Sequence, residues 1–184
     1  MISKSLKSIL VLLVAFLAVF WEAAFNGIRH WVGAQIDLLP ALMVYASLQT
    51  GIVTVCLLAM LGGLWFDTLS ANPLGVTVVP LFAVGVLIYV MRDLILREQT
   101  FAQFTLGLAS SLFAPVCVLL LLLTTGHEPL FGWGTLWQLI VMGLGGAIAT
   151  PVIFEVFAWL ERILGYAGPS EPSFRPDREI RRGR

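Results

Sequence analysis

The sequence predicts an all-α, polytopic membrane protein with six transmembrane helices and both termini in the cytoplasm. Hydrophobic residues make up 59% of the 184-residue chain and charged residues only 12%, whereas an ordinary soluble domain is about 45–50% apolar and about 25% charged. The apolar residues gather into long stretches without Lys, Arg, Asp or Glu. This composition excludes a soluble globular domain, a disordered chain and a coiled coil. The net charge of +0 argues against nucleic-acid binding, which needs an excess of cations to neutralise phosphates.

Hydropathy and local signals divide the chain into spans. A helix needs about 20 apolar residues to cross the hydrocarbon core, and the stretch 38–66 is too long for one crossing. Its polar break Gln49-Thr50-Gly51 predicts two helices. Asp37 precedes the first of them and is expected to cap it, while Pro40 sits in its first turn, where a missing N–H costs little. The expected spans are residues 8–25, 35–49, 52–66, 73–91, 101–124 and 136–160.

The distribution of basic residues favours six spans over five. Lys and Arg are retained on the cytoplasmic side of a membrane. With six spans and a cytoplasmic N-terminus, every Lys and Arg except Arg29 falls on that side, whereas with five spans only Lys4 and Lys7 would do so. The same two lysines before an apolar run also resemble a signal peptide. Residues 20–22 are not the small residues of a cleavage site, so we expect an uncleaved first span.

The composition changes after residue 164. Residues 165–184 are rich in Pro and Arg and contain too few apolar residues to fold alone. We therefore expect a six-helix membrane domain over 1–164 and a flexible cytoplasmic tail over 165–184. The tail could be merely solvated, or it could contact anionic lipid headgroups or a cytoplasmic partner. The predicted outer loops are short and leave no room for an enzymatic domain outside the membrane.

The most informative segment is GGLWFDTLSANPLG, residues 62–75. Gly62 and Gly63 are expected to pack closely against another helix, and Asp67 is expected to end span three at the outer face. Two interpretations of Asp67 remain open. It could only cap and solvate a turn, or it could help to present a docking surface for a partner, since an ionisable residue at membrane depth is often functional.

The second half of this segment predicts the start of the next helix. Asn72 and Pro73 are typical of an N-cap followed by a first helical residue. Gly75 is expected to let another backbone approach the new helix. Together these residues predict a tight helix–turn–helix at the outer membrane face.

Small residues and isolated acids complete the pattern. Small residues four apart let helices approach closely in lipid, and we expect most to pack the bundle, with those of span six also able to face a partner. Glu22 and Glu155 are expected to be solvated at interfaces rather than to form a proton site. The small pairs are Ala59 and Gly63, Gly107 and Ser111, Gly143 and Ala147, and Gly145 and Ala149.

Reactive groups do not assemble into a recognisable pattern. His127-Glu128 begins like a zinc-protease motif, but the second His is missing. The sequence contains no Walker loop, no GxGxxG and no evident Ser-His-Asp set. We therefore expect no enzymatic activity, no cofactor and no metal.

The residues of the outer segment carry a family resemblance. Asp37-Leu38-Leu39, followed by Gly62-Gly63-Leu64-x-x-Asp67-x-x-Ser70-x-x-Pro73-Leu74-Gly75, resembles the MreD family of bacterial rod shape-determining proteins. The resemblance covers about residues 37–160, and the length and six predicted spans are also similar. Trp65-Phe66 departs from the aliphatic residues usual at this place. The positions that carry over, as structural or partner-interface residues, are Asp37, Gly62, Gly63, Asp67, Ser70, Pro73 and Gly75.

The resemblance implies a function as well as a fold. It implies a non-enzymatic scaffold of the cell-wall elongation (Rod) complex, which maintains rod shape during peptidoglycan synthesis in the bacterial cytoplasmic membrane. The implied partners are the membrane helix of MreC, bound directly, and, in the same complex, MreB, a RodA-type glycosyltransferase and a class B transpeptidase.

An alternative function follows from the same resemblance. The family is similar in fold to the substrate-binding S-components of energy-coupling factor transporters, so the alternative is an S-component-like vitamin-binding subunit. S-components typically use small residues four apart on span one to contact their energy-coupling partner. Ala15, Ala18, Ala23 and Ala24 do not have that spacing.

Overall fold

The structure is a computed structural model that describes residues 4–24, 33–70, 73–94, 99–125 and 132–165. Throughout these residues it is all-helical, with no strand, as the sequence predicts. Four helices are long and apolar enough to span a membrane, and two apolar helices are shorter. The helices are α1 (Lys4–Ala24), α3 (Leu39–Gln49), α4 (Ile52–Leu57), η1 (Leu58–Gly62), α5 (Gly63–Leu69), α6 (Val78–Met91), α7 (Thr100–Thr124) and α8 (Trp133–Gly165).

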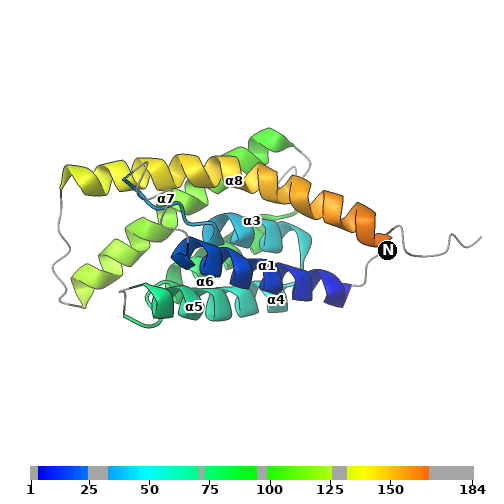
Figure 1. Cartoon of the computed structure of the whole chain (residues 1–184), viewed down its shortest axis with the longest axis horizontal. Helices are drawn as coiled ribbons and strands as arrows, with labels where there is room; N and C mark the ends of the chain where they lie inside the picture. The colour runs from blue at the N-terminus through cyan, green and yellow to red at the C-terminus, as the bar shows by residue number, and fades with distance from the viewer. Residues whose placement is uncertain (1–3, 25–32, 71–72, 95–98, 126–131, 166–184) are drawn as a thin grey trace, which may run out of the picture.

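The helices form rods that run back and forth along one bundle (Figure 1). α4, η1 and α5 follow one another without a break and make one rod with a π-helical turn in its middle. The start of α1 and the end of α8 lie at the same end of the bundle, where Lys7 Nζ and Glu161 Oε1 are 2.8 Å apart. Ser8 and Thr54 share a hydrogen bond of 2.7 Å between their hydroxyls, which ties α1 to α4.

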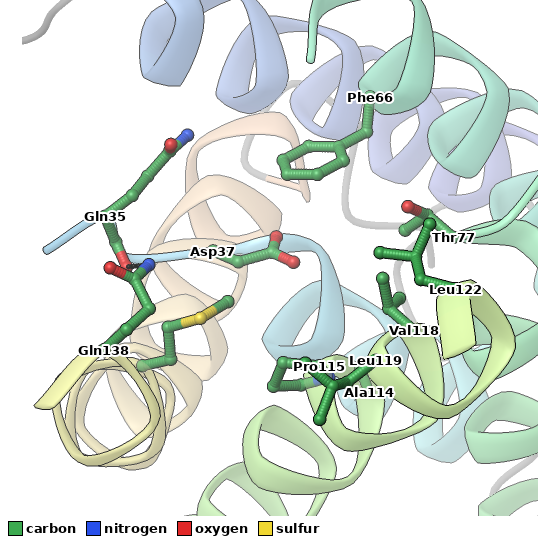
Figure 2. Close-up of a pocket in the computed structure, with 11 residues that line it drawn as sticks. Gln35, Asp37, Phe66, Thr77, Ala114, Pro115, Val118, Leu119, Leu122 and Gln138 are labelled. Carbon is green, nitrogen blue, oxygen red and sulfur yellow. Dashed lines mark hydrogen bonds between the residues drawn. The ribbon is translucent and has the colours of Figure 1, made fainter. Parts of the chain in front are cut away.

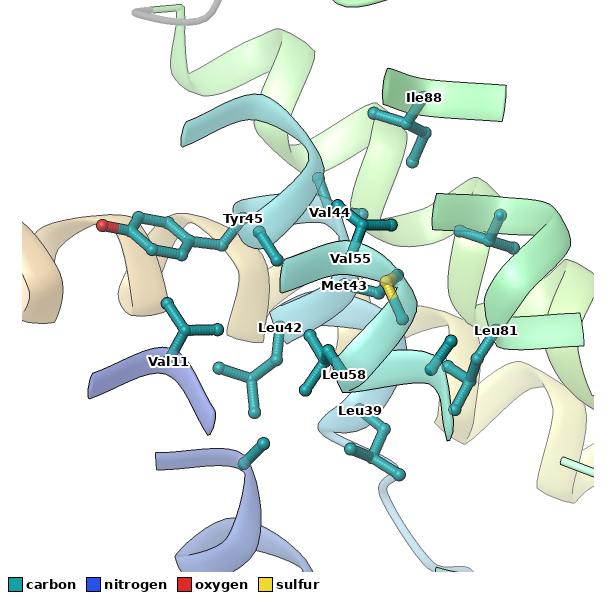
Figure 3. Packing of buried hydrophobic residues seen from close by; sticks show 14 of the residues in the cluster. Val11, Leu39, Leu42, Met43, Val44, Tyr45, Val55, Leu58, Leu81 and Ile88 are labelled. Atoms are coloured by element: carbon teal, nitrogen blue, oxygen red, sulfur yellow. The ribbon is translucent and has the colours of Figure 1, made fainter. Parts of the chain in front are cut away.

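The short helix α3 is the centre of the bundle. Every residue from Leu39 to Leu48 is buried, and α3 contacts each of the other rods. A helix that is apolar all round is expected to be buried all round. Leu42 of α3 packs toward Val11 of α1, and Met43 packs toward α4 and α6 (Figure 3). Tyr45 stacks on Phe157 of α8 with ring centroids 4.2 Å apart.

Small residues bring α7 and α8 together where they cross. A Cβ added to Gly107 of α7 would lie 2.6 Å from the carbonyl oxygen of Gly146 in α8 and would also overlap the Thr150 side chain. Gly146 in turn lies against Ser111. The spacing of small residues therefore serves packing inside the bundle, as expected. We also expected that the small residues of α8 could face a partner; among them Gly143 and Gly146 are covered by α7, and Gly145 lies against Ile36.

The span boundaries agree closely with the sequence for α7 and differ by several residues elsewhere. α3 begins at Leu39, four residues after the expected start at residue 35. α7 matches the expected span 101–124 almost residue for residue, and α8 extends beyond its expected span at both ends. The prediction that Pro73 is the first residue of the fourth span is wrong, because α6 begins at Val78. Asn72, Arg29, the two histidines and the tail after residue 165 lie outside the described residues.

Gly107→Ala should lower the stability of the bundle. The added methyl group has no space against the α8 backbone, and overpacking of this kind costs about 1–3 kcal/mol. Gly134→Ala is the matched control, because a Cβ at Gly134 meets nothing within 4 Å. The thermal unfolding midpoint of the purified protein in detergent measures both. Equal midpoints for the two variants would contradict the close crossing of α7 and α8.

Candidate functional site

A cavity lies at the end of the bundle where α3 begins and where α5 gives way to α6. α7 and α8 separate beyond their crossing toward this end (Figure 1), and the cavity of about 190 Å³ lies between them. Its walls are mostly apolar, with a few polar groups, and Figure 2 shows them. The lining residues are Gln35, Asp37, Phe66, Thr77, Ala114, Pro115, Val118, Leu119, Leu122, Gln138 and Met142.

Asp37 is the charged residue of this cavity. Its side chain points into the space between Phe66 and Thr77 (Figure 2), and the residue is only 6% exposed. Oδ1 accepts a hydrogen bond of 2.9 Å from the backbone N–H of Leu39, so Asp37 binds the first N–H group of α3, although the N-cap residue is Leu38 and not Asp37. Among the described residues this is the one hydrogen bond of the carboxylate, and Oδ2 has no partner from that part of the chain.

Glu22 meets the same helix end from α1. Its Oε1 accepts a hydrogen bond of 2.7 Å from the backbone N–H of Leu38, and its Oε2 is buried without a partner among the described residues. The expectation that Glu22 is solvated at an interface, away from other acids, is therefore wrong. The physical reason is that the first N–H groups of a buried helix need acceptors and carry partial positive charge.

Asp67 organises the connection between α5 and α6 from within. It is 2% exposed. Its Oδ2 accepts hydrogen bonds from the backbone N–H groups of Gly75 (2.8 Å) and Thr77 (3.2 Å), and its Oδ1 accepts one from the Thr77 hydroxyl. The carboxylate therefore caps the turn into α6, as one of the two interpretations expects, but it does so from a buried position and is not solvated.

The remaining motif residues serve this connection or the packing beneath it. Gly75 has φ of +90°, a conformation that favours glycine. We expected another backbone to approach it, but no described residue lies within 4 Å of its Cβ position. Ser70 is the C-cap residue of α5, and the turn from Pro73 is closed by a hydrogen bond from the Val76 N–H to the Pro73 carbonyl. The start of α6 differs from the prediction because Asp67 binds the backbone N–H groups of Gly75 and Thr77.

The two glycines of the motif let α5 and its π-helical turn approach their neighbours, as expected. A Cβ on Gly63 would lie 2.9 Å from the Cα of Val78 in α6. A Cβ on Gly62 would lie 3.1 Å from the Leu39 side chain of α3. The motif thus joins the start of α3, the end of α5 and the start of α6, which are the elements around the cavity.

Thr77 links two of the predicted site residues. Its side chain lines the cavity across from Asp37 (Figure 2), and its hydroxyl donates to Asp67 behind it. Gln138 of α8 lines another wall, and its Nε2 donates to the main-chain oxygen of Gln35 at 3.3 Å. The polar groups of the cavity thus come from three separate parts of the chain.

Some of these residues were not singled out from the sequence. Thr77 and Gln138 carry no local signal, because their roles depend on which helices meet. Glu22 did have a signal, since it is the one acid in an otherwise apolar first span. In the described ranges no group of three or more His, Cys, Asp or Glu could hold a metal ion. The arrangement can hold the polar end of a ligand by hydrogen bonds and its apolar part by contact.

Comparisons with known proteins give no match: no protein-family model, no curated protein and no solved structure is significantly similar to the chain.

Asp67→Asn should lower stability by about 1–3 kcal/mol, because the amide removes the charge that binds three donors and turns an N–H₂ group toward one of them. Asp93→Asn is the control, since the side chain of Asp93 is 82% exposed. Thr77→Val completes a double-mutant cycle with Asp67→Asn. The losses of stability caused by the two substitutions, followed by the unfolding midpoint, should be strongly non-additive. Additive losses would mean that the two side chains do not interact.

Proposed function

We propose that this chain is a multi-pass scaffold subunit of the MreD type in the bacterial cytoplasmic membrane, with six crossings and both termini inside. It would act without chemistry, by holding the membrane helix of MreC in a complex with MreB, a RodA-type glycosyltransferase and a class B transpeptidase. The observation that carries this proposal is the convergence of Asp37 and the motif 62–75 at one end of the bundle.

The six crossings are supported by the direction of the rods. Consecutive rods run in opposite directions (Figure 1), and the salt bridge of Lys7 with Glu161 joins the start of the first rod to the end of the last. The 11-residue α3 is about 16 Å long at 1.5 Å per residue, shorter than the roughly 30 Å core of a bilayer. Because longer helices surround α3, it can contribute a crossing without facing lipid along its length.

The docking surface would be the turn that Asp67 holds. This turn exposes two large apolar side chains, Leu69 (47% exposed) and Leu74 (69% exposed). Hydrogen bonds to Asp67 hold the backbone of Gly75 and Thr77, so Leu74 is presented next to a held part of the chain. A preordered apolar surface loses little conformational freedom when a partner binds.

A small-molecule carrier similar to an S-component is the second candidate. The specific observation in its favour is the cavity with Asp37 in its wall. A carrier would need an energy-coupling partner, whereas a scaffold would need MreC. The protein that co-purifies with the full chain distinguishes the two.

A reporter fused after Arg184 should be active only in the cytoplasm. The reason is that an even number of crossings returns the C-terminus to the side of Lys4 and Lys7. Paired fusions to alkaline phosphatase, which is active outside, and to a fluorescent protein that folds inside, measure this. Phosphatase activity at the C-terminus would rule out six crossings.

Leu74→Glu should reduce capture of MreC by at least tenfold without changing the unfolding midpoint, because it puts a charge on the proposed apolar surface and not in the core. Leu94→Glu is the matched control, since Leu94 is 83% exposed at the opposite end of α6. Pull-down of co-expressed MreC from the same organism measures capture. Unchanged capture by Leu74→Glu and by Asp67→Asn would refute this docking surface.

A further inference from the structure

Two oxygen atoms in the wall of the cavity can accept a further hydrogen bond. Asp37 Oδ2 has no partner among the described residues, although the residue is more than nine-tenths buried. The Thr77 hydroxyl has one hydrogen and donates it to Asp67, so its oxygen can only accept from a further group. Asp37 stands in the wall of the cavity, so a ligand that brings hydrogen-bond donors would complete the hydrogen bonding of this carboxylate.

The charge of the site points the same way. No Lys or Arg is among the described residues that line the cavity, while Asp37 stands in its wall and Asp67 lies directly behind Thr77. A phosphate or carboxylate would be repelled here, and a cation would be attracted.

The remaining walls are hydrocarbon. Val118, Leu119 and Leu122 line one side from the outer half of α7, and Phe66 and Met142 line others. A bare metal ion would lack ligands on these sides, since inorganic cations such as Ca²⁺ need six to eight oxygens. A purely apolar molecule would leave the Asp37 oxygen unpaired. The walls and the carboxylate together fit a molecule with an ammonium group on an apolar body.

We propose that this cavity binds a hydrophobic primary amine, with the ammonium group against Asp37 Oδ2 and Thr77 Oγ1 and the apolar body along α7. An ammonium group has three donors, and a hydrogen bond between ionised partners is about twice as strong as a neutral one. The amine could come from a bilayer lipid such as phosphatidylethanolamine or from a soluble molecule. The inference rests on the cavity alone and is independent of binding to MreC.

Phenethylamine is a suitable probe, and phenethyl alcohol is its neutral counterpart of nearly equal shape. The full chain, purified in a non-ionic detergent, should bind phenethylamine saturably in isothermal titration calorimetry. The bound amine should also raise the thermal unfolding midpoint of the protein. Phenethyl alcohol should bind at least tenfold more weakly. Equal binding of the two probes would overturn the proposal, because it would mean that the cavity recognises only the apolar body.

Variants test the assigned groups. Asp37→Asn keeps an oxygen for the Leu39 N–H but removes the charge, and should weaken phenethylamine binding by at least tenfold. Val118→Phe should abolish binding by filling the cavity while it leaves every polar group in place. This second variant keeps the test decisive even if Asp37→Asn fails to fold. Asp93→Asn is the charge control and should bind as the wild type does. Unweakened binding by folded Asp37→Asn would overturn the proposal.

Native mass spectrometry distinguishes the source of the amine. Protein extracted from vesicles of equal parts phosphatidylethanolamine and phosphatidylglycerol should retain the former if the source is the bilayer, and Asp37→Asn should not retain it. Saturable binding of phenethylamine without lipid retention would indicate a soluble amine. Absence of both would refute the site.

Discussion

The structure depends on supplying acceptors to a helix that starts inside the bundle. α3 is buried along its length, so its first N–H groups cannot be solvated as they would be at a surface. Glu22 from α1 and Asp37 from the preceding segment each take one of these groups, and Pro40 has none to satisfy. Without acceptors these N–H groups would each cost free energy comparable to a lost hydrogen bond. Two acids in an apolar protein are thus explained by the backbone they serve.

Asp67 likewise supplies acceptors to buried backbone N–H groups, at the connection between α5 and α6. Its carboxylate accepts three hydrogen bonds from the stretch between α5 and α6. It lies beside the cavity and not on the outer surface. Asp37 and Asp67 are 30 positions apart in the chain, yet Thr77 stands between them in space. One polar cluster therefore both closes the end of the bundle and gives the cavity its polar wall.

The sequence predicted the parts of the fold that depend on local composition. Long apolar runs located α7 and α8, and the polar break at Thr50-Gly51 correctly separated α3 from α4. The start of α6 was not predictable from Asn72-Pro73, because the competing hydrogen bonds come from Asp67 in the preceding rod. Asp37 and Asp67 were singled out from the sequence, but their common cavity was not. That cavity depends on where α7 and α8 diverge, which no local pattern specifies.

The unequal length of the rods has a consequence for where empty space can exist. α3 has 11 residues, while α7 has 25 and α8 has 33, so α3 is shorter than these two helices by about 20 Å and about 30 Å. α7 and α8 flank the cavity beside the start of α3. The cavity is the space that the short α3 leaves between its longer neighbours. Lengthening α3 by one turn would be the simplest change, in evolution or by design, that fills it.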